Sequence, residues 1–411
     1  MYSKALIGLI IGRVATTVIA STMIVGIGWH LYEATGSAFD LALIGLFQII
    51  PIFLFTLPAG WVADNFSRKT ILLLTSSLQI LILVVIALLM NQETLNKWYL
   101  YSALVVLAIG RAFFAPAIQS ALPNIVKAED LNKAVALVSS SWNLALTLGP
   151  FIAGFLIAWL DKDFYWLLLA FGIFNIFGFS LLPDFKSSGE KKTINVSDLL
   201  GGVAYLRKSP EVLGSMVVDL FIVLLGSVMA ILPVFVKDVL NAGPEVLGLL
   251  RAMPAVGATL VGIVLTRRKQ PIQQNGRALF IALFIFSSSI VLFATVHIVW
   301  VAAVALFIYG ASDMISVVLR SSIVQICTPD RLRGRVSSLN TLFIASSNEL
   351  GDFRSGSAAA LLGPVTGALV GGIMAFAVVG ISMIVFKPLR QLGELKAYED
   401  DQPSTETSDS K

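Results

Sequence analysis

Two long apolar runs on either side of a short charged segment constrain this chain more than any other feature. One run covers about residues 40–63 and the other about residues 70–90. An apolar run of about 20 residues is long enough to cross a membrane as a helix. The charged segment, Gly60 to Lys69, is so short that the chain has to turn at the membrane surface. We name residues 60–69 the hinge, and we expect a membrane protein.

The composition supports this expectation. Of the 411 residues, 57% are apolar and 13% are charged, against roughly 25% charged residues in a soluble domain. A soluble fold would need a very large core with almost no polar cover. The net charge of +4 is spread over loops, so we expect the lipid bilayer and no nucleic acid as a partner.

Twelve apolar segments can be placed along the chain, which predicts an all-α integral membrane protein with 12 transmembrane helices. The segments cover about residues 5–32, 40–64, 70–91, 98–122, 133–160, 164–183, 212–237, 245–266, 277–297, 298–325, 336–361 and 364–386. The first segment resembles a signal peptide, but Arg13 interrupts it and further spans follow. We therefore expect it to be retained as a helix.

The positive charges indicate which side of the membrane the hinge faces. Of the 29 Lys and Arg residues, 21 fall on the hinge side, 3 on the opposite side and 5 inside spans. Loops rich in Lys and Arg stay in the cytoplasm. The hinge and both termini are therefore expected on the cytoplasmic side of a bacterial inner membrane.

One long connection divides the chain. Residues 184–211 form a predicted cytoplasmic linker between an N-terminal six-helix bundle, residues 1–183, and a C-terminal six-helix bundle, residues 212–388. Within the linker, residues 193–206 are typical of a capped amphipathic helix on the membrane surface. Residues 389–411 are polar and are predicted to be a disordered cytoplasmic tail.

The two halves repeat weakly. The segment Gly45 to Pro51 reads like Gly248 to Pro254 at an offset of 203. Three single pairs have similar offsets: Gly110 with Gly310, Asp130 with Asp330, and Gly149 with Gly351. Parallel repeats of six spans are typical of one transporter architecture.

Charged residues inside spans are candidates for function, because each costs at least about 2.5–3.5 kcal/mol in the hydrocarbon. They are Arg13, Arg111, Asp219, Arg251, Asp313, Arg320, Glu349, Asp352 and Arg354. Spans three, six, nine and twelve have none, so we expect these spans to face lipid. Spans one, four, seven and ten are then expected to line a central polar cavity.

These charges suggest roles. Asp219, Asp313 and Glu349 are candidates for proton coupling, because burial and a moving arginine shift a carboxyl group between its protonated and charged forms. Arg13, Arg111 and Arg320 are candidates for the substrate cavity. The aromatic residues Phe113, Phe114, Trp142 and Phe221 are candidates to stack on a planar ligand. The alternative is that the charges only pair with one another and hold the halves together.

Glycine and proline in span five predict a helix that bends. Gly149, Pro150 and Gly154 combine a kink with a surface for close helix approach. No cofactor or metal site is expected, because Cys327 is a lone cysteine and His30 and His297 lie near span ends. Phosphate-loop and zinc-protease motifs are also absent from the sequence, so an enzyme is not expected.

The hinge resembles the loop between spans two and three of the major facilitator superfamily. Gly60, Asp64, Arg68 and Lys69 match its pattern, whereas Asn65 and Ser67 depart from it. The resemblance implies that Asp64 and Arg68 meet the start of span eleven, near Arg333 and Arg335, in a cytoplasmic gate.

Further segments resemble the branch that contains the bacterial enterobactin exporter and macrolide-efflux proteins. They are Tyr32 to Ser37, Asp219 to Phe221, Asp313 to Val317, Thr328 to Val336 and Ser347 to Gly351. The resemblance implies a monomeric secondary transporter that exports a siderophore or lipophilic drug by proton antiport. An importer or lysolipid flippase of the same fold, and a non-transporting receptor, remain alternatives.

Overall fold

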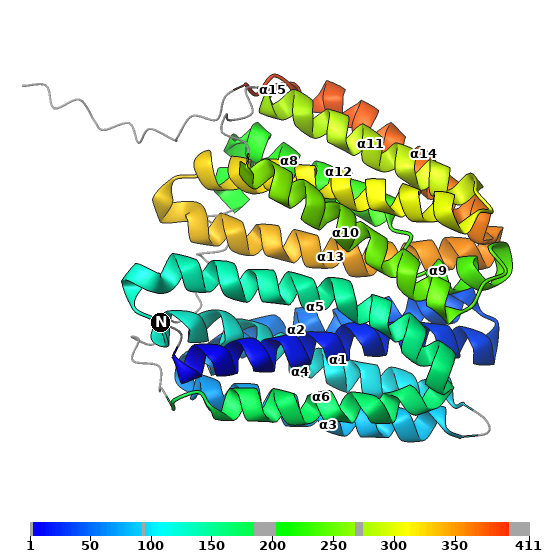
Figure 1. Ribbon diagram of the computed structural model, residues 1–411. Coiled ribbons are helices and arrows are strands. Elements are labelled where there is room, and N and C mark those ends of the chain that lie inside the picture. The colour runs from blue at the N-terminus through cyan, green and yellow to red at the C-terminus, as the bar shows by residue number, and fades with distance from the viewer. Residues whose placement is uncertain (1–2, 93–94, 185–202, 268–273, 394–411) are drawn as a thin grey trace, which may run out of the picture.

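The computed structural model describes residues 3–92, 95–184, 203–267 and 274–393. Six long helices form the N half: α1 (Lys4–Thr35), α2 (Ala38–Asn65), α3 (Arg68–Met90), α4 (Lys97–Ala121), α5 (Leu131–Leu160) and α6 (Phe164–Ser180). Short 3₁₀ turns join them, η1 (Leu122–Asn124), η2 (Ala128–Asp130) and η3 (Asp161–Asp163). The N half occupies the lower part of the view in Figure 1.

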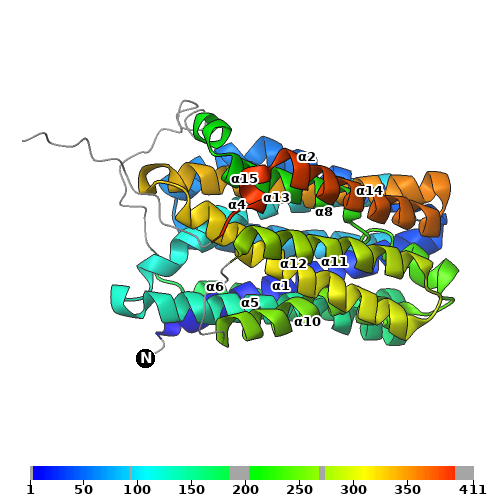
Figure 2. The same ribbon diagram turned by 90° about the horizontal axis from the view of Figure 1, so that it is seen from above.

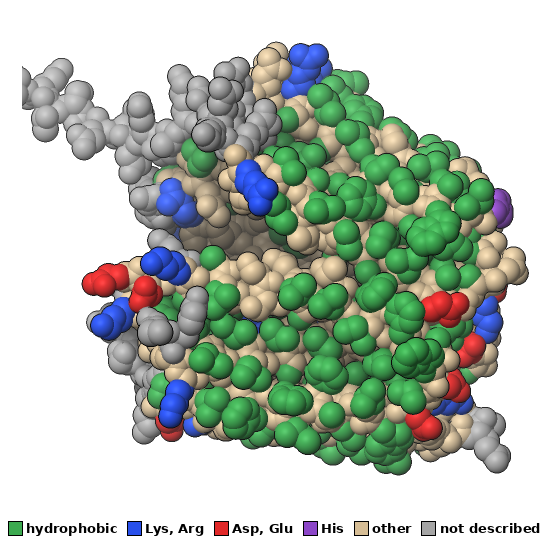
Figure 3. Space-filling model, viewed as in Figure 1, with side chains coloured by type: hydrophobic (Ala, Val, Ile, Leu, Met, Phe, Trp, Pro, Cys, Tyr) green, Lys and Arg blue, Asp and Glu red, His purple; other side chains and the backbone are tan. Residues whose placement is uncertain are grey.

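The C half lies above it in the same view. Its elements are α8 (Pro210–Gly226), α9 (Leu232–Val234), the π-helical turn η4 (Phe235–Val239), α10 (Pro244–Arg267), α11 (Asn275–Thr295), α12 (Val299–Ile326), α13 (Asp330–Leu362), α14 (Pro364–Val385) and α15 (Lys387–Arg390). The long helices of both halves run along one common direction (Figure 2). Side chains on the outer surface are hydrophobic along the helices, and charges gather at the two ends (Figure 3).

The all-α membrane fold with twelve crossing units is confirmed for the described part of the chain. Nine of its segments are long and apolar enough to cross a membrane, and one of them, residues 133–180, contains both α5 and α6. The two other units are α8, which has 17 residues, and α13, which carries several charges. We name the end that carries the hinge the hinge face, and the other end the opposite face.

Local sequence signals set the helix boundaries. Ser3, Ser37 and Ser67 precede α1, α2 and α3, and each hydroxyl accepts a hydrogen bond from an amide of the first turn, at 3.2, 3.2 and 3.4 Å. Gly36 ends α1 at φ 61°, a left-handed conformation that glycine adopts without strain. Two residues, Gly36 and Ser37, are therefore enough to reverse the chain between α1 and α2.

The seventh span is not the single helix that the sequence predicts over residues 212–237. Helix α8 ends at Gly226, residues 227–231 have no regular helix, and the chain resumes as α9 and η4. Pro233 lies in the first turn of α9 rather than inside a helix. The apolar composition of residues 212–237 predicts a span but cannot predict this break. The side chains that stabilise the break belong to other helices.

Glycine contacts reproduce the internal repeat. A Cβ atom on Gly149 would lie 1.9 Å from Ser21 Oγ, and one on Gly351 would lie 2.9 Å from the carbonyl oxygen of Val223. Both glycines and both partners are related by the same offset, 202 residues. The repeat predicted from sequence is thus visible as packing of α5 on α1 and of α13 on α8. The pair Gly110 and Gly310 does not show this equivalence, since the two glycines contact α3 and α10.

The halves meet through α5 with α10 and through α2 with α13. A Cβ atom on Gly154 would lie 2.5 Å from the carbonyl oxygen of Pro244, and one on Gly356 would lie 2.7 Å from Ala42 Cβ. These contacts also repeat at an offset of 202. Both seams between the halves therefore depend on close backbone approach, as the small residues of span five predict.

The end of the linker is bound to the C half. Residues 203–208 are helical, and Leu206 is buried. The Tyr205 hydroxyl donates to the carbonyl oxygen of Cys327, after α12. Burial raises the pKa of Tyr205, so the phenol stays a neutral donor. Most of the predicted amphipathic helix and the polar tail lie outside the described residues.

Candidate functional site

A cavity of about 490 Å³, lined by both polar and apolar side chains, lies within the N half. It is lined by Arg13, Thr16, Thr17, Ala20, Ser21, Met23, Ile24, Gln48, Thr75, Ser76, Leu78, Gln79, Leu107, Gly110, Arg111, Phe114, Ala115, Ile118, Gln119, Trp142 and Leu146. These residues come from α1 to α5. The cavity has the size of a small-molecule site.

Two of the three arginines predicted for the cavity line it. Arg111 Nη1 donates to Gln48 Oε1 at 2.7 Å, so α4 and α2 hold this guanidinium together. The guanidinium carbon of Arg13 lies 5.0 Å from the centre of the Trp142 ring, a cation–π arrangement. Two cations and an exposed indole therefore face the same space, together with the Phe114 ring.

The expectation that spans three and six only face lipid is wrong in part. Thr75, Ser76 and Gln79 of α3 line the cavity. Asn175 of α6 is fully buried, and its amide nitrogen donates to Thr16 Oγ1 at 3.0 Å and to Gln79 Oε1 at 3.2 Å. The absence of charged residues did not reveal the polar faces of α3 and α6, because the polar side chains on these faces are uncharged.

The third predicted cavity arginine, Arg320, lies elsewhere. It is 5% exposed, forms an ion pair with Asp219, and donates from Nε to Ser316 Oγ at 3.1 Å. Asp219 is 4% exposed. The pair joins α12 to α8 inside the C half, and Arg320 does not line the cavity described above.

Asp219 forms an ion pair, whereas the carboxylates of Asp313 and Glu349 form no ion pair with another described residue. Asp313 lies within electrostatic range of Arg320 and Asp219, yet it has no hydrogen bond or ion pair with another described side chain. Glu349 of α13 lies within electrostatic range of Arg111 in the other half and of Asp352. Glu349 therefore lies between Arg111, which lines the cavity of the N half, and Asp352 of the C half.

Three further charges stabilise the break in the seventh span. Arg354 donates to the carbonyl oxygens of Leu224 and Leu225, which helix α8 leaves unpaired at its end, and to that of Ser227, the residue that follows the helix. Ser227 donates from Oγ to Asp352 Oδ1 at 2.6 Å. Arg251 Nη2 donates to the carbonyl oxygen of Met229 at 3.1 Å. Arg354, Asp352 and Arg251 thus have a structural role within the membrane, because each forms hydrogen bonds with polar groups at the break.

The hinge is bound to its own half. Lys69 Nζ donates to the carbonyl oxygen of Ser180 at 2.7 Å, and Ser67 donates to Asp184. Asp64 is exposed and forms no ion pair or hydrogen bond with another described residue, and Arg68 Nε is buried without a partner among them. Arg333 and Arg335 lie in the first turns of α13. The structure does not join Asp64 or Arg68 to these two arginines, and Gly60 has no atom near its Cβ position.

Gly149, Pro150 and Gly154 lie where span five touches two partners. Gly149 packs on α1, and its carbonyl oxygen accepts a hydrogen bond from Thr22 Oγ1 at 3.1 Å. Gly154 packs on α10 of the other half. Pro150 lies inside α5 between these two contacts.

At the opposite face, side chains join the halves directly. The Tyr32 hydroxyl donates to Asp238, and Lys237 Nζ lies 3.5 Å from Glu33 Oε1. The Lys237 ammonium also lies 5.8 Å from the centre of the Trp29 ring. Toward the hinge face, by contrast, the surface is hollowed between the halves (Figure 3).

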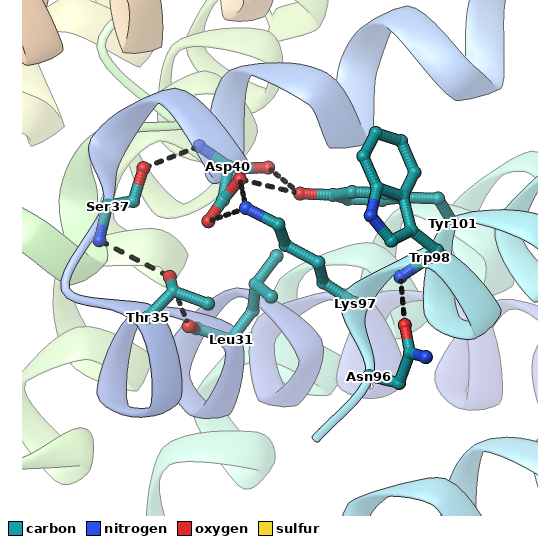
Figure 4. Close-up of polar contacts among 8 residues, drawn as sticks. All are labelled: Leu31, Thr35, Ser37, Asp40, Asn96, Lys97, Trp98 and Tyr101. Atoms are coloured by element: carbon teal, nitrogen blue, oxygen red, sulfur yellow. Dashed lines mark hydrogen bonds and ion pairs between the residues drawn. The ribbon is translucent and has the colours of Figure 1, made fainter. Parts of the chain in front are cut away.

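One polar cluster at the opposite face was missed in the sequence. Lys97 Nζ lies 2.9 and 3.1 Å from the two carboxylate oxygens of Asp40, and the Tyr101 hydroxyl donates to Asp40 Oδ1 at 3.1 Å (Figure 4). Asp40 is 3% exposed. The cluster fastens the start of α4 to the start of α2. An acid in the first turn of one span, with a lysine at the start of a later span on the same side, was the available signal.

The described residues thus form twelve membrane-crossing units in two related halves, with a polar cavity in one half and buried charges in the other. This arrangement defines a membrane transporter for small solutes. The chain matches the family described as transmembrane secretion effector over residues 7–407, and it belongs to this family of the major facilitator superfamily. It is a multi-pass transport protein and not an enzyme.

Relatives and solved structures agree with this assignment. The chain is 25% identical over 359 residues to the enterobactin exporter EntS of Shigella boydii, covering 85% of this chain and 83% of that protein. It is 25% identical over 361 residues to the enterobactin exporter EntS of Salmonella typhi, covering 86% and 83%.

Among solved structures, a POT family transporter in complex with 5-aminolevulinic acid has a TM-score of 0.74 at 12% identity and covers 94% of this chain and 97% of its own. A bacterial homologue of the lysosomal transporter Spinster, inward-facing and unoccupied, has a TM-score of 0.69 at 14% identity and covers 94% and 95%. These two structures show the shared fold.

Proposed function

We propose that the protein exports a small organic molecule across the bacterial inner membrane by alternating access, driven by proton entry. The observation that carries this proposal is the asymmetry between the two faces. Side chains join the halves at the opposite face, and the surface is hollowed between them toward the hinge face. With the hinge and both termini in the cytoplasm, as the positive charges favour, this is the state that receives substrate from inside the cell.

The cavity favours an aromatic substrate with a negatively charged or polar group. Arg13 and Arg111 supply the cations, and Trp142 and Phe114 supply surfaces for stacking. The relatives named as enterobactin exporters point to the siderophore class, and lipophilic drugs of similar size are the second class.

A lysolipid flippase would have to admit lipid toward the hinge face, because both seams between the halves are tightly packed near the opposite face. A flippase needs a lateral opening from the membrane into the cavity. Gly154 closes the seam of α5 with α10, and Gly356 closes the seam of α2 with α13, each by close backbone approach. An importer would use the same parts in reverse, so direction is decided by transport measurements.

The proposal is tested by efflux assays in proteoliposomes with an imposed pH gradient and a panel of siderophores and lipophilic drugs. We expect at least one aromatic compound to move against its gradient, and Arg13→Gln and Arg111→Gln to weaken that transport. No response of any compound to the pH gradient would overturn proton antiport. Net movement of the compound in the same direction as the protons would identify a proton-coupled importer.

For the coupling carboxylate we propose Asp313 first, with Asp219 and Glu349 assisting. Asp313 lies near the Asp219–Arg320 pair without being bound to it, so a proton can enter and leave without breaking an ion pair. Replacing Asp313 by Asn is expected to abolish proton-driven efflux while the protein stays folded, because Asn cannot change its charge. Substrate-induced proton release and efflux are measured together, with the exposed-site variant Glu129→Gln as control. Unchanged proton release in Asp313→Asn would exclude Asp313.

For the gate we propose that Asp64 and Arg68 meet the start of α13 when the hinge face closes. Replacing Asp64 by Asn is then expected to favour the state that is open at the hinge face. The measure is the rate of thiol labelling at a cysteine placed at Ala115, which lines the cavity, in a Cys327→Ser background. We expect faster labelling in Asp64→Asn and no change in Asp163→Asn, which removes the same charge at the opposite face. Equal labelling rates in both variants would argue against the gate.

A further inference from the structure

A histidine and two carboxylates, none of which lines the cavity, come together at the opposite face. The donor atoms of His30, Glu33 and Asp161 all lie within 4.8 Å of one another. His30 and Glu33 are three residues apart on α1 and so share one face of the helix. Asp161 joins them from η3, at the end of α5. The sequence offered no signal for this cluster, because Asp161 is 131 residues from His30.

The His30 ring is held rigidly with one nitrogen aimed at the carboxylates. The residue is 2% exposed, and its ring stacks 6.0 Å from the Phe164 ring. Nε2 lies 3.0 Å from Asp161 Oδ1, and Nδ1 lies 3.2 Å from the Tyr165 hydroxyl. A metal-binding histidine normally uses one nitrogen for the metal and donates from the other to a fixed oxygen. The Tyr165 hydroxyl, fully buried, occupies the second position.

The two carboxylates are accessible from solution. The Asp161 side chain is 71% exposed and that of Glu33 is 39% exposed. Asp161 has φ 46°, a left-handed conformation that a non-glycine residue adopts only at a cost. Here it brings the carboxylate beside the His30 ring. One buried imidazole with two open carboxylates supplies three protein ligands and leaves further positions for water, as in transition-metal sites with three protein ligands.

We propose that His30, Glu33 and Asp161 bind a divalent transition-metal ion such as Zn²⁺ or Mn²⁺ at the opposite face. Nε2 of His30 and one carboxylate oxygen from each acid would be the protein ligands, and the Tyr165 hydroxyl would orient the imidazole. The site is separate from the transport cavity and does not depend on the proposed substrate.

Binding of the ion would compete with a contact between the halves. Glu33 is also the partner of Lys237 at 3.5 Å, and Lys162 is the other cation near His30. An ion that binds the Glu33 carboxylate would break its ion pair with Lys237. The hydrogen bond from Tyr32 to Asp238 would still join the two halves there. Metal binding therefore weakens the closure of the opposite face.

The test uses full-length protein in detergent, freed of metal by a chelator and titrated with Co²⁺ and Zn²⁺. Calorimetry gives stoichiometry and affinity, and the visible absorption of bound Co²⁺ reports nitrogen coordination. We expect one ion per chain. Asp161→Asn, which keeps the size of the side chain and removes its charge, and Glu33→Gln should each weaken affinity by about tenfold or more, the range known for altered metal surroundings.

Three further variants make the test specific. Lys237→Gln removes the competitor for Glu33 and is expected to tighten binding, whereas Glu33→Gln weakens it. Asp163→Asn removes an exposed carboxylate of the same turn that is outside the cluster, and should leave affinity unchanged. The proposal is overturned if no ion binds, or if Asp163→Asn weakens binding as much as Asp161→Asn does. Tyr165→Phe should weaken binding while keeping the Co²⁺ spectrum of a histidine ligand.

Discussion

Replacing Arg320 by Met is expected to destabilise the protein by about 3–5 kcal/mol, the range for removing one partner of a buried ion pair. Arg320 is 5% exposed and Asp219 is 4% exposed, so the substitution leaves a carboxylate without its counter-charge in the low-dielectric interior. The free energy of unfolding is measured by chemical denaturation of the purified protein in detergent. Most of the stability should return in the double variant Asp219→Asn with Arg320→Met, because no charge then stays buried alone.

The control for this prediction is Arg390→Met, which removes an arginine from the exposed end of α15 and should change stability by about 0.5 kcal/mol or less. If the double variant were as unstable as Arg320→Met alone, packing of the Arg320 side chain, and not its charge, would be the main contribution.

Replacing Gly154 by Val is expected to force the two halves apart at the opposite face and to abolish transport. The new side chain would begin 2.5 Å from the carbonyl oxygen of Pro244 and 2.8 Å from Gly248 Cα. Both are backbone atoms that cannot turn away. Overpacking of this kind costs about 1–3 kcal/mol, enough to change the balance between two conformations by about 5- to 150-fold. Efflux and spin-label distances across the opposite face are the measurements.

A matched glycine exists for this experiment. Gly380 of α14 has no atom within 4 Å of its Cβ position, so Gly380→Val should leave both efflux and the distances unchanged. If Gly154→Val keeps its efflux and the distances do not change, α5 and α10 can accommodate the larger side chain without moving the two halves apart, and the prediction is wrong.

The sequence predicted those parts of the fold that depend on local composition. Apolar runs located the spans, and Ser37 and Ser67 mark helix starts because a hydroxyl caps the first turn whatever the rest of the fold is. The offset of 202 to 203 residues between Gly149 and Gly351, or Gly45 and Gly248, predicted the repeat. Arg13 and Arg111 line the cavity of the N half, as expected for a cation in a span that needs polar surroundings, and their role in binding substrate stays a prediction.

Features that depend on partners far along the chain were not predicted. The break after Gly226 needs Arg354 to donate hydrogen bonds to the free carbonyl oxygens at the end of α8, and nothing near Gly226 in the sequence shows this. Arg320 could not be separated from Arg13 by composition, because only the fold decides whether an arginine meets a carboxylate or a cavity. The same holds for Asp40, whose partners Lys97 and Tyr101 begin another helix.

The broken seventh span has a mechanical consequence. Arg354 and Asp352 fasten the end of α8 to α13, and Arg320 fastens its middle to α12. These three helices are therefore expected to move together. When α13 tilts against α2 of the other half, the end of α8 has to move with it. Under the proposed proton coupling, a change of charge at Asp313, which lies within electrostatic range of Asp219 and Arg320, would act on this joint and reach the seam between the halves through the connected helices.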